Sequence, residues 1–141
     1  MIDLLGQAGC VSIEAGVESI TEAGRDLLAK KCKLSTDEIT ERLLYAKQSV
    51  PFVQANLLDS QCDDPDDVEA WREHLHRHGV WANKAVPLFP YPGSPDYTQR
   101  WGQADDLAWE RAHEFYLSQF DEFSDIQEQR PASLVQLEAH K

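Results

Sequence analysis

Three short apolar runs alternate with segments typical of amphipathic helices, and this alternation restricts the fold more than any other feature of the chain. The runs cover residues 10–17, 52–58 and 80–88, and the first alternates apolar with small or polar residues from Val11 to Gly16. Such β-branched runs are typical of strands with at least one buried face. The connections between the runs are long enough for the crossovers that parallel pairing requires. The sequence therefore predicts an α/β fold with three parallel βα units.

Helix-end signals stand between the predicted strands. Ser35 followed by Glu38 forms a capping box, and Asp64 before Pro65 combines an N-cap residue with a proline at the first helical position. Helices are expected over residues 2–8, 21–31, 36–48 and 65–78.

The chain changes character after Leu88. Residues 89–95 hold three prolines and are expected to be extended, because proline disfavours both helix interiors and central strands. An amphipathic helix is expected over residues 105–122, and residues 125–141 are either a docked short helix or a frayed tail. We therefore expect residues 103–141 to form a helical C-terminal extension.

A sheet of three parallel strands has two unpaired edges, which folded proteins normally cover or close into a barrel. Two solutions are open at this point. The chain either associates along a strand edge or forms half of a barrel whose other half precedes it, and a sequence that starts within a predicted helix favours the second.

Charge and cysteine content narrow the partners and the compartment. The chain has 25 acidic against 13 basic residues, a formal net charge of −12 that repels phosphate backbones and anionic membrane surfaces. We therefore expect no nucleic-acid or membrane partner. Its three cysteines, Cys10, Cys32 and Cys62, are odd in number and far apart, which favours a reducing, cytoplasmic location.

Polar residues at the carboxyl ends of the predicted strands are the first candidates for a ligand site, because parallel α/β folds bind ligands there. Glu14 and Glu18 share one face of the first strand, and Gln54 and Asn56 share one face of the second, with Asp59 just after it. Structural alternatives stay open. Glu14 could pair with a lysine and Glu18 could cap the next helix, and the two amides could be an ordinary buried pair.

The aspartates between Asp59 and Asp67 raise the question of a calcium site. A twelve-residue calcium loop counted from Asp59 would need glycine at position six and glutamate at position twelve, where the chain has Asp64 and Ala70. Helix capping and the helix dipole are the favoured explanation for these acidic side chains.

Two segments carry a family resemblance. Residues 11–19 (VSIEAGVES) and 90–97 (PYPGSPDY) resemble the carboxyl-terminal half of the barrel of radical S-adenosylmethionine (SAM) enzymes, nearest to those with an amino-terminal cobalamin-binding domain. In that subgroup the fourth strand ends in Gly-Val-Glu-Ser, and Pro-x-Pro-Gly-Thr/Ser-Pro follows the sixth. The resemblance covers residues 1–102 and implies half of a partial TIM-like barrel.

The resemblance also implies a site. Glu18 and Ser19 would contact the ribose or methionine part of SAM, and backbone near Val86 and Leu88 would meet the adenine. The other implied cofactor-binding residues are Glu14, Gln54, Asn56 and Asp59. The family's Gly-x-Pro-Gly-Glu turn is replaced here by residues 59–63 (DSQCD), and the CxxxCxxC motif that holds the [4Fe-4S] cluster is absent from the chain.

The expected function follows from the resemblance. With an N-terminal half that carries the cluster, the chain would belong to an enzyme that generates a 5′-deoxyadenosyl radical for chemistry on an unknown small-molecule or other substrate. Alone it would be inactive, and whether cobalamin is used stays open. The alternative is a non-catalytic, acidic α/β interaction module that oligomerises through its strand edges.

Overall fold

The computed structural model describes residues 1–119, which form two compact units that divide between Val86 and Pro87. The observed division therefore lies upstream of the boundary expected at residue 102. Residues 87–102 belong to the same unit as the helices that follow them. The predicted segment 125–141 and the end of the helix predicted to reach residue 122 lie outside the described residues.

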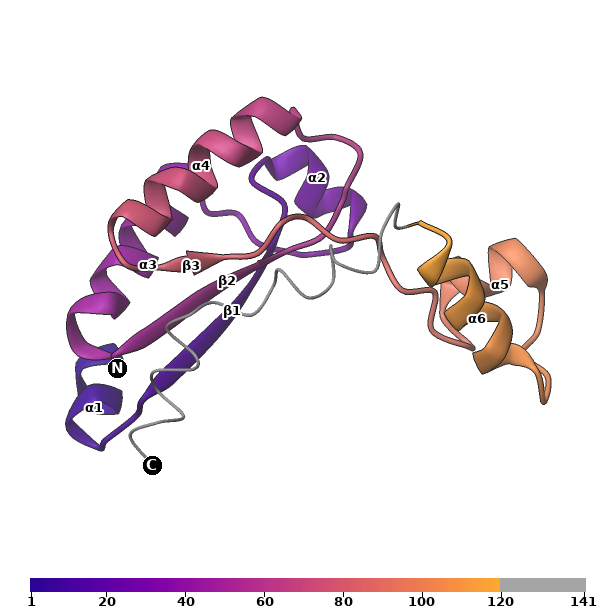
Figure 1. Cartoon of the computed structure of the whole chain (residues 1–141), viewed down its shortest axis with the longest axis horizontal. Coiled ribbons are helices and arrows are strands. Elements are labelled where there is room, and N and C mark those ends of the chain that lie inside the picture. The colour runs from indigo at the N-terminus through magenta and orange to yellow at the C-terminus, as the bar shows by residue number, and fades with distance from the viewer. Residues whose placement is uncertain (120–141) are drawn as a thin grey trace. The chain divides into compact units, whose positions relative to one another are not determined.

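The first unit is a parallel sheet with helices (Figure 1). Its strands lie in the order β1-β2-β3, so the predicted α/β fold with three parallel strands is confirmed. The elements in chain order are α1 (Ile2–Gln7), β1 (Ser12–Glu18), α2 (Glu22–Leu27), α3 (Thr36–Ser49), β2 (Phe52–Leu57), α4 (Pro65–Arg77) and β3 (Trp81–Ala82).

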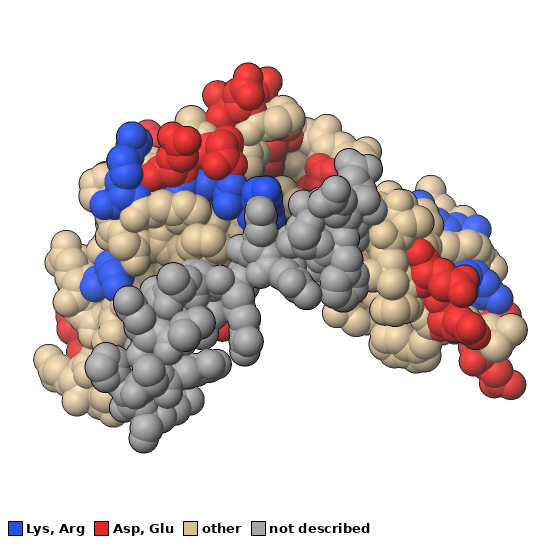
Figure 2. Space-filling view, in the orientation of Figure 1, with Lys and Arg blue, Asp and Glu red and all other residues tan. Residues whose placement is uncertain are grey.

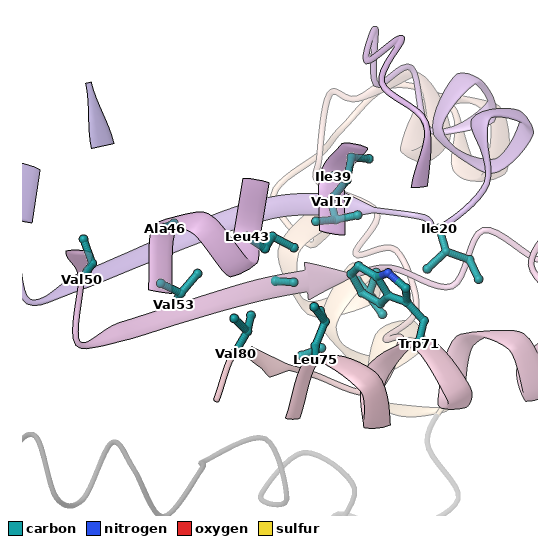
Figure 3. Close-up of a cluster of buried hydrophobic side chains, with 13 residues drawn as sticks. Val17, Ile20, Ile39, Leu43, Ala46, Val50, Val53, Trp71, Leu75 and Val80 are labelled. Atoms are coloured by element: carbon teal, nitrogen blue, oxygen red, sulfur yellow. The ribbon is translucent and has the colours of Figure 1, made fainter. Parts of the chain in front are cut away.

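The hydrophobic core lies between one face of the sheet and helices α3 and α4. Figure 3 shows Val17 and Val53 from the strands pointing toward Leu43 of α3 and Leu75 of α4. Each buried aliphatic side chain of this kind stabilises the fold by about 1.5–3 kcal/mol. The indole Nε1 of Trp71 donates to Thr40 Oγ1 at 2.8 Å and so ties α4 to α3. The helices thus cover one face of the sheet.

The predicted N-terminal caps of α3 and α4 are confirmed. Ser35 and Glu38 form the reciprocal capping box of α3, and Asp64 accepts hydrogen bonds from backbone N–H groups in the first turn of α4. Helix α2 is shorter than the predicted 21–31. It ends at Leu27, and Ala29 adopts a left-handed φ of 56°, which breaks the helical backbone.

Strand β3 is also shorter than the predicted 80–88, and a side chain explains the difference. The buried Asn83 accepts from Leu57 N–H through Oδ1 at 2.7 Å and donates to Leu57 O through Nδ2 at 3.1 Å. Its amide therefore takes the place of a strand backbone beside β2. The chain loops out at Lys84 and Ala85 and rejoins the sheet through a bridge between Val86 and Leu58.

The two edges of the sheet differ. At the β3 edge, Ala82 O accepts from Arg72 Nε at 3.2 Å, and Ala82 N–H donates to His76 Nε2 at 3.1 Å, so side chains of α4 cover the edge backbone. At the β1 edge, the described part of the chain provides no neighbouring strand.

The second unit packs two helices, α5 (Pro95–Trp101) and α6 (Ala108–Leu117), around the buried ring of Tyr97. Arg111 donates to the Tyr97 hydroxyl at 2.6 Å. Helix α5 is absent from the predicted elements, although Ser94 and Pro95 are an N-cap and first-turn pair like Asp64 and Pro65. Among the helices of residues 1–119, none is long and apolar enough to cross a membrane.

Candidate functional site

The sheet face opposite the helices brings three of the predicted site residues together. Glu14 and Gln54 are partners in the parallel register of β1 and β2, and Gly16 is the partner of Asn56. Gln54 Nε2 donates to Asn56 Oδ1 at 2.5 Å, so the two amides orient each other along β2. Glu14 and Gly16 are exposed and both amides are half-buried, which leaves this face accessible to a ligand.

Glu18 lies at the carboxyl end of β1, where the register with β2 is irregular. Its φ of 69° is unusual for a residue with a side chain. The carboxylate folds back over Gly16: a Cβ on that glycine would lie 2.5 Å from Glu18 Oε1. Lys30 Nζ lies 3.2 Å from the same oxygen. The lysine pair considered for Glu14 is therefore made by Glu18 instead, and the cap of α2 considered for Glu18 is made by Thr21.

Ser19 does not share this open face. Its side chain is fully buried, and its hydroxyl donates to Asp63 Oδ1 at 2.8 Å. The hydroxyl therefore holds two loops of the fold together, and its contact with a nucleotide stays a prediction from the resemblance.

Asp63 is the centre of a hydrogen-bond network that the sequence analysis missed. Its carboxylate accepts from Ser19 Oγ, from Thr21 Oγ1 at 2.6 Å, and from the backbone N–H groups of Ile20 and Thr21. Burial by itself raises the pKa of Asp63, but these hydrogen bonds outweigh it and hold the pKa below its ordinary value. The loop after β2 is thereby fastened to the turn after β1.

Close packing supports this network. Gly24 of α2 lies so near to Ser19 and Ser60 that a Cβ would overlap Ser19 Oγ and lie 2.7 Å from Ser60 Oγ. The sequence alone could not separate Asp63 from the neighbouring aspartates, because the contact that distinguishes it comes from residues more than 40 positions away.

Asp59 lies beside a second feature, a pocket of about 270 Å³ at the carboxyl end of β2. Its exposed carboxylate accepts from Gln61 N–H at 2.9 Å in a tight local turn. The polar residues that line the pocket are Asp59, Ser60, Asp63, Glu69, Arg72 and Lys84. Figure 2 shows acidic side chains gathered over α4, the helix that starts at this pocket.

The last two predicted residues lie after β3. The backbone of Val86 bonds to the end of β2, since its N–H donates to Leu57 O and its carbonyl accepts from Asp59 N–H. Leu88 is exposed and belongs to the second unit. The structure therefore places Val86 beside the strands of the candidate site, and the role of Leu88 stays a prediction from the resemblance.

The groups on the open face suit one implied cofactor and not the other. Carboxylates at Glu14 and Glu18 and amides at Gln54 and Asn56 fit SAM, which carries a sulfonium, an ammonium and ribose hydroxyls. An iron–sulfur cluster does not fit, because the described residues contain no group of three or more metal-ligating side chains.

Comparison with known proteins identifies no relative of this chain. The chain has no significant match to a protein-family model, to a curated protein or to a solved structure.

Proposed function

We propose that this chain supplies the second half of a radical SAM barrel and that SAM binds on the open face of β1 and β2. The observation that carries the proposal is the placement of Glu14, Glu18, Gln54 and Asn56 on adjacent parallel strands, opposite the face that α3 and α4 cover. The resemblance in residues 11–19 and 90–97 supplies the identity of the ligand.

The unequal edges of the sheet support the same proposal. A half-barrel needs one edge for the preceding strand and protection at its last strand. Arg72 and His76 cover the β3 edge. Beside the β1 edge, where residues 1–119 provide no neighbouring strand, lies an apolar groove of about 350 Å³, lined among others by Leu5, Ile13 and Leu34. In the whole protein, the N-terminal half of the barrel pairs with β1 and fills this groove.

The chain's own residues would then bind and orient SAM. The Glu18 carboxylate accepts hydrogen bonds from the ribose or the ammonium group, and the paired amides of Gln54 and Asn56 fix the ligand against β2. The cluster and SAM supply the radical chemistry when both are present, with cluster ligands from outside the described residues. A cytoplasmic location and an unidentified substrate remain part of the proposal.

A binding experiment tests it. The ¹⁵N-labelled chain is titrated with SAM, and amide chemical shifts are followed by NMR. We expect the shifts to be confined to residues of β1, β2 and the turns that follow them, and to shrink in the variant Asn56→Ala. Gln48→Ala, an exposed amide substitution on α3, is the matched control and should bind like the unmodified chain. An unchanged spectrum, or shifts confined to the helical face, would overturn the proposal.

The β1 edge, which no other strand of the described residues pairs with, also favours a second candidate, an interaction module that associates through this strand. That candidate requires a stable closed oligomer, which size-exclusion chromatography with light scattering would detect. A monomer that shows the SAM-dependent shifts would exclude it.

A further inference from the structure

Two consecutive peptide groups in the turn after β1 lie between opposite charges. Their N–H groups, on Ile20 and Thr21, donate to the Asp63 carboxylate at 3.3 and 3.2 Å. Their carbonyls, on Ser19 and Ile20, each accept from Arg25 Nη1 at 3.0 Å. Each peptide group therefore has an acid on its N–H side and a guanidinium on its carbonyl side.

Arg25 needs a source of negative charge. Its side chain is 1% exposed, and no carboxylate within residues 1–119 forms a salt bridge with it. Its other contact is again a carbonyl, Leu34 O, at 2.7 Å. A buried guanidinium without an anion is costly, whereas hydrogen bonds in a chain polarise one another. The two peptide groups thus connect Arg25 to the charge of Asp63.

The described contacts of Asp63 all serve this turn. Helix α2 has Thr21 as its cap and helix α4 has Asp64, so neither helix depends on Asp63 as its cap. The hydroxyls of Ser19 and Thr21 add two further donors to the carboxylate.

Glu18 directly precedes the turn and needs to be held. A left-handed φ such as its 69° persists only where the surroundings impose it. On one side, Glu18 O accepts from Leu58 N–H of the β2 end at 2.7 Å. On the other side, the turn at residues 19–21 is fixed by Asp63 and Arg25.

We propose that Asp63 and Arg25 form an ion pair mediated by these two peptide groups, and that Asp63 is thereby a positioning residue for the Glu18 carboxylate. The role of Glu18 toward SAM rests on the proposed function, whereas the ion pair and its effect on Glu18 do not.

Hydrogen exchange tests the contact with Asp63. Asp63→Asn keeps the shape of the side chain but removes its charge, so the Ile20 and Thr21 amides should exchange about tenfold faster or more. Asp67→Asn is the matched control, because its carboxylate makes no hydrogen bond or ion pair among the described residues. Equal exchange of both amides in Asp63→Asn and in the unmodified chain would overturn the proposal.

A double-mutant cycle tests the pairing itself. Arg25→Met and Asp63→Asn are made singly and together, and the unfolding equilibrium is measured by urea denaturation. A mediated ion pair predicts that the double variant loses less stability than the sum of the two single losses, by about fivefold or more in the unfolding constant. Additive losses would overturn the pairing. If Arg25→Met does not fold, Arg25→Gln, which also removes the positive charge, replaces it in the same cycle.

A third readout isolates the effect on Glu18. The coupling constant between the amide and α protons of Glu18 reports its φ in the absence of any ligand. We expect this coupling constant to change in Asp63→Asn and to have the value of the unmodified chain in Asp63→Glu. Asp67→Asn should leave it unaltered. The same coupling constant in Asp63→Asn and the unmodified chain would overturn the positioning role. A failure of SAM to shift the spectrum would overturn the proposed function alone.

Discussion

Gly24 shows how a single residue controls the approach of α2 to the turn after β1. A Cβ at this position would overlap the hydroxyl of Ser19, and Ser19 and Ser60 are both buried. We therefore expect Gly24→Ala to lower the free energy of unfolding by about 1–3 kcal/mol, measured by urea denaturation.

A substitution at Ala29 should change the free energy of unfolding in the opposite direction to Gly24→Ala. The φ of 56° at Ala29 costs an L-residue energy that glycine avoids. Part of that gain is offset by the larger backbone entropy of glycine in the unfolded chain. Ala29→Gly should therefore raise the free energy of unfolding by up to about 1 kcal/mol. A loss as large as that of Gly24→Ala would contradict the steric account of both sites.

Asp63 should make the stability of the chain depend on pH. Its pKa is lower in the folded than in the unfolded state, so the carboxylate stabilises the fold fully above its unfolded pKa. This contribution is lost as the pH falls from about 4 through the folded pKa. Urea midpoints measured across this range should fall less steeply in Asp63→Asn than in the unmodified chain. Parallel pH profiles would contradict the assignment.

Sequence patterns indicated part of the site at this scale. The period-two alternation of strands predicted that Glu14 and Glu18 would share one face of the first strand and Gln54 and Asn56 one face of the second. The register places Glu14 beside Gln54 and becomes irregular before Glu18. The burial of Ser19 and the network around Asp63 could not be predicted, because both depend on how distant loops meet.

Asn83 acts at the scale of an element, since its side chain continues the sheet where β3 ends. Asn83→Ala would leave the buried N–H of Leu57 without its Asn83 partner and its carbonyl with the Val86 N–H alone. We expect a loss of about 2 kcal/mol in the free energy of unfolding. Asn56→Ala is the control, because the amide it leaves behind, on Gln54, is half-buried and can reach water. Equal losses in the two variants would contradict the proposed continuation of the sheet.

The elements themselves were predictable where local chemistry decides them. Strands β1 and β2 and the caps of α3 and α4 follow from alternation and capping residues. The early end of β3 was not predictable, because the apolar run continues while a side chain replaces the backbone. Helix α5 was missed because its first residue is one of a group of prolines, although Ser94 caps it.

The net charge of −12 belongs to the whole molecule and should affect the binding of a cation. Salt screens the attraction between this charge and SAM, so the affinity for SAM should fall as the salt concentration rises. Adenosine lacks the sulfonium and the ammonium and serves as the control. Equal salt dependence of the two ligands in calorimetric titrations would contradict an electrostatic contribution from the net negative charge of the chain.

At the scale of the whole molecule, the sequence predicted a sheet with two unpaired edges. It did not predict that side chains of the described residues would cover one of these edges and not the other. The cover over β3 depends on Arg72 and His76, one helical turn apart on α4, meeting Ala82. The division between the two units after Val86 lies close to the change of character after Leu88, whereas the resemblance had placed the boundary at residue 102.

Photo-crosslinking of radiolabelled SAM to the full chain, followed by peptide mapping, tests the central claim most directly. The account predicts label on peptides that contain residues 11–19 and 52–59, and reduced label in the presence of excess unlabelled SAM. Label on α3 and α4 alone, or incorporation that unlabelled SAM does not reduce, would contradict it.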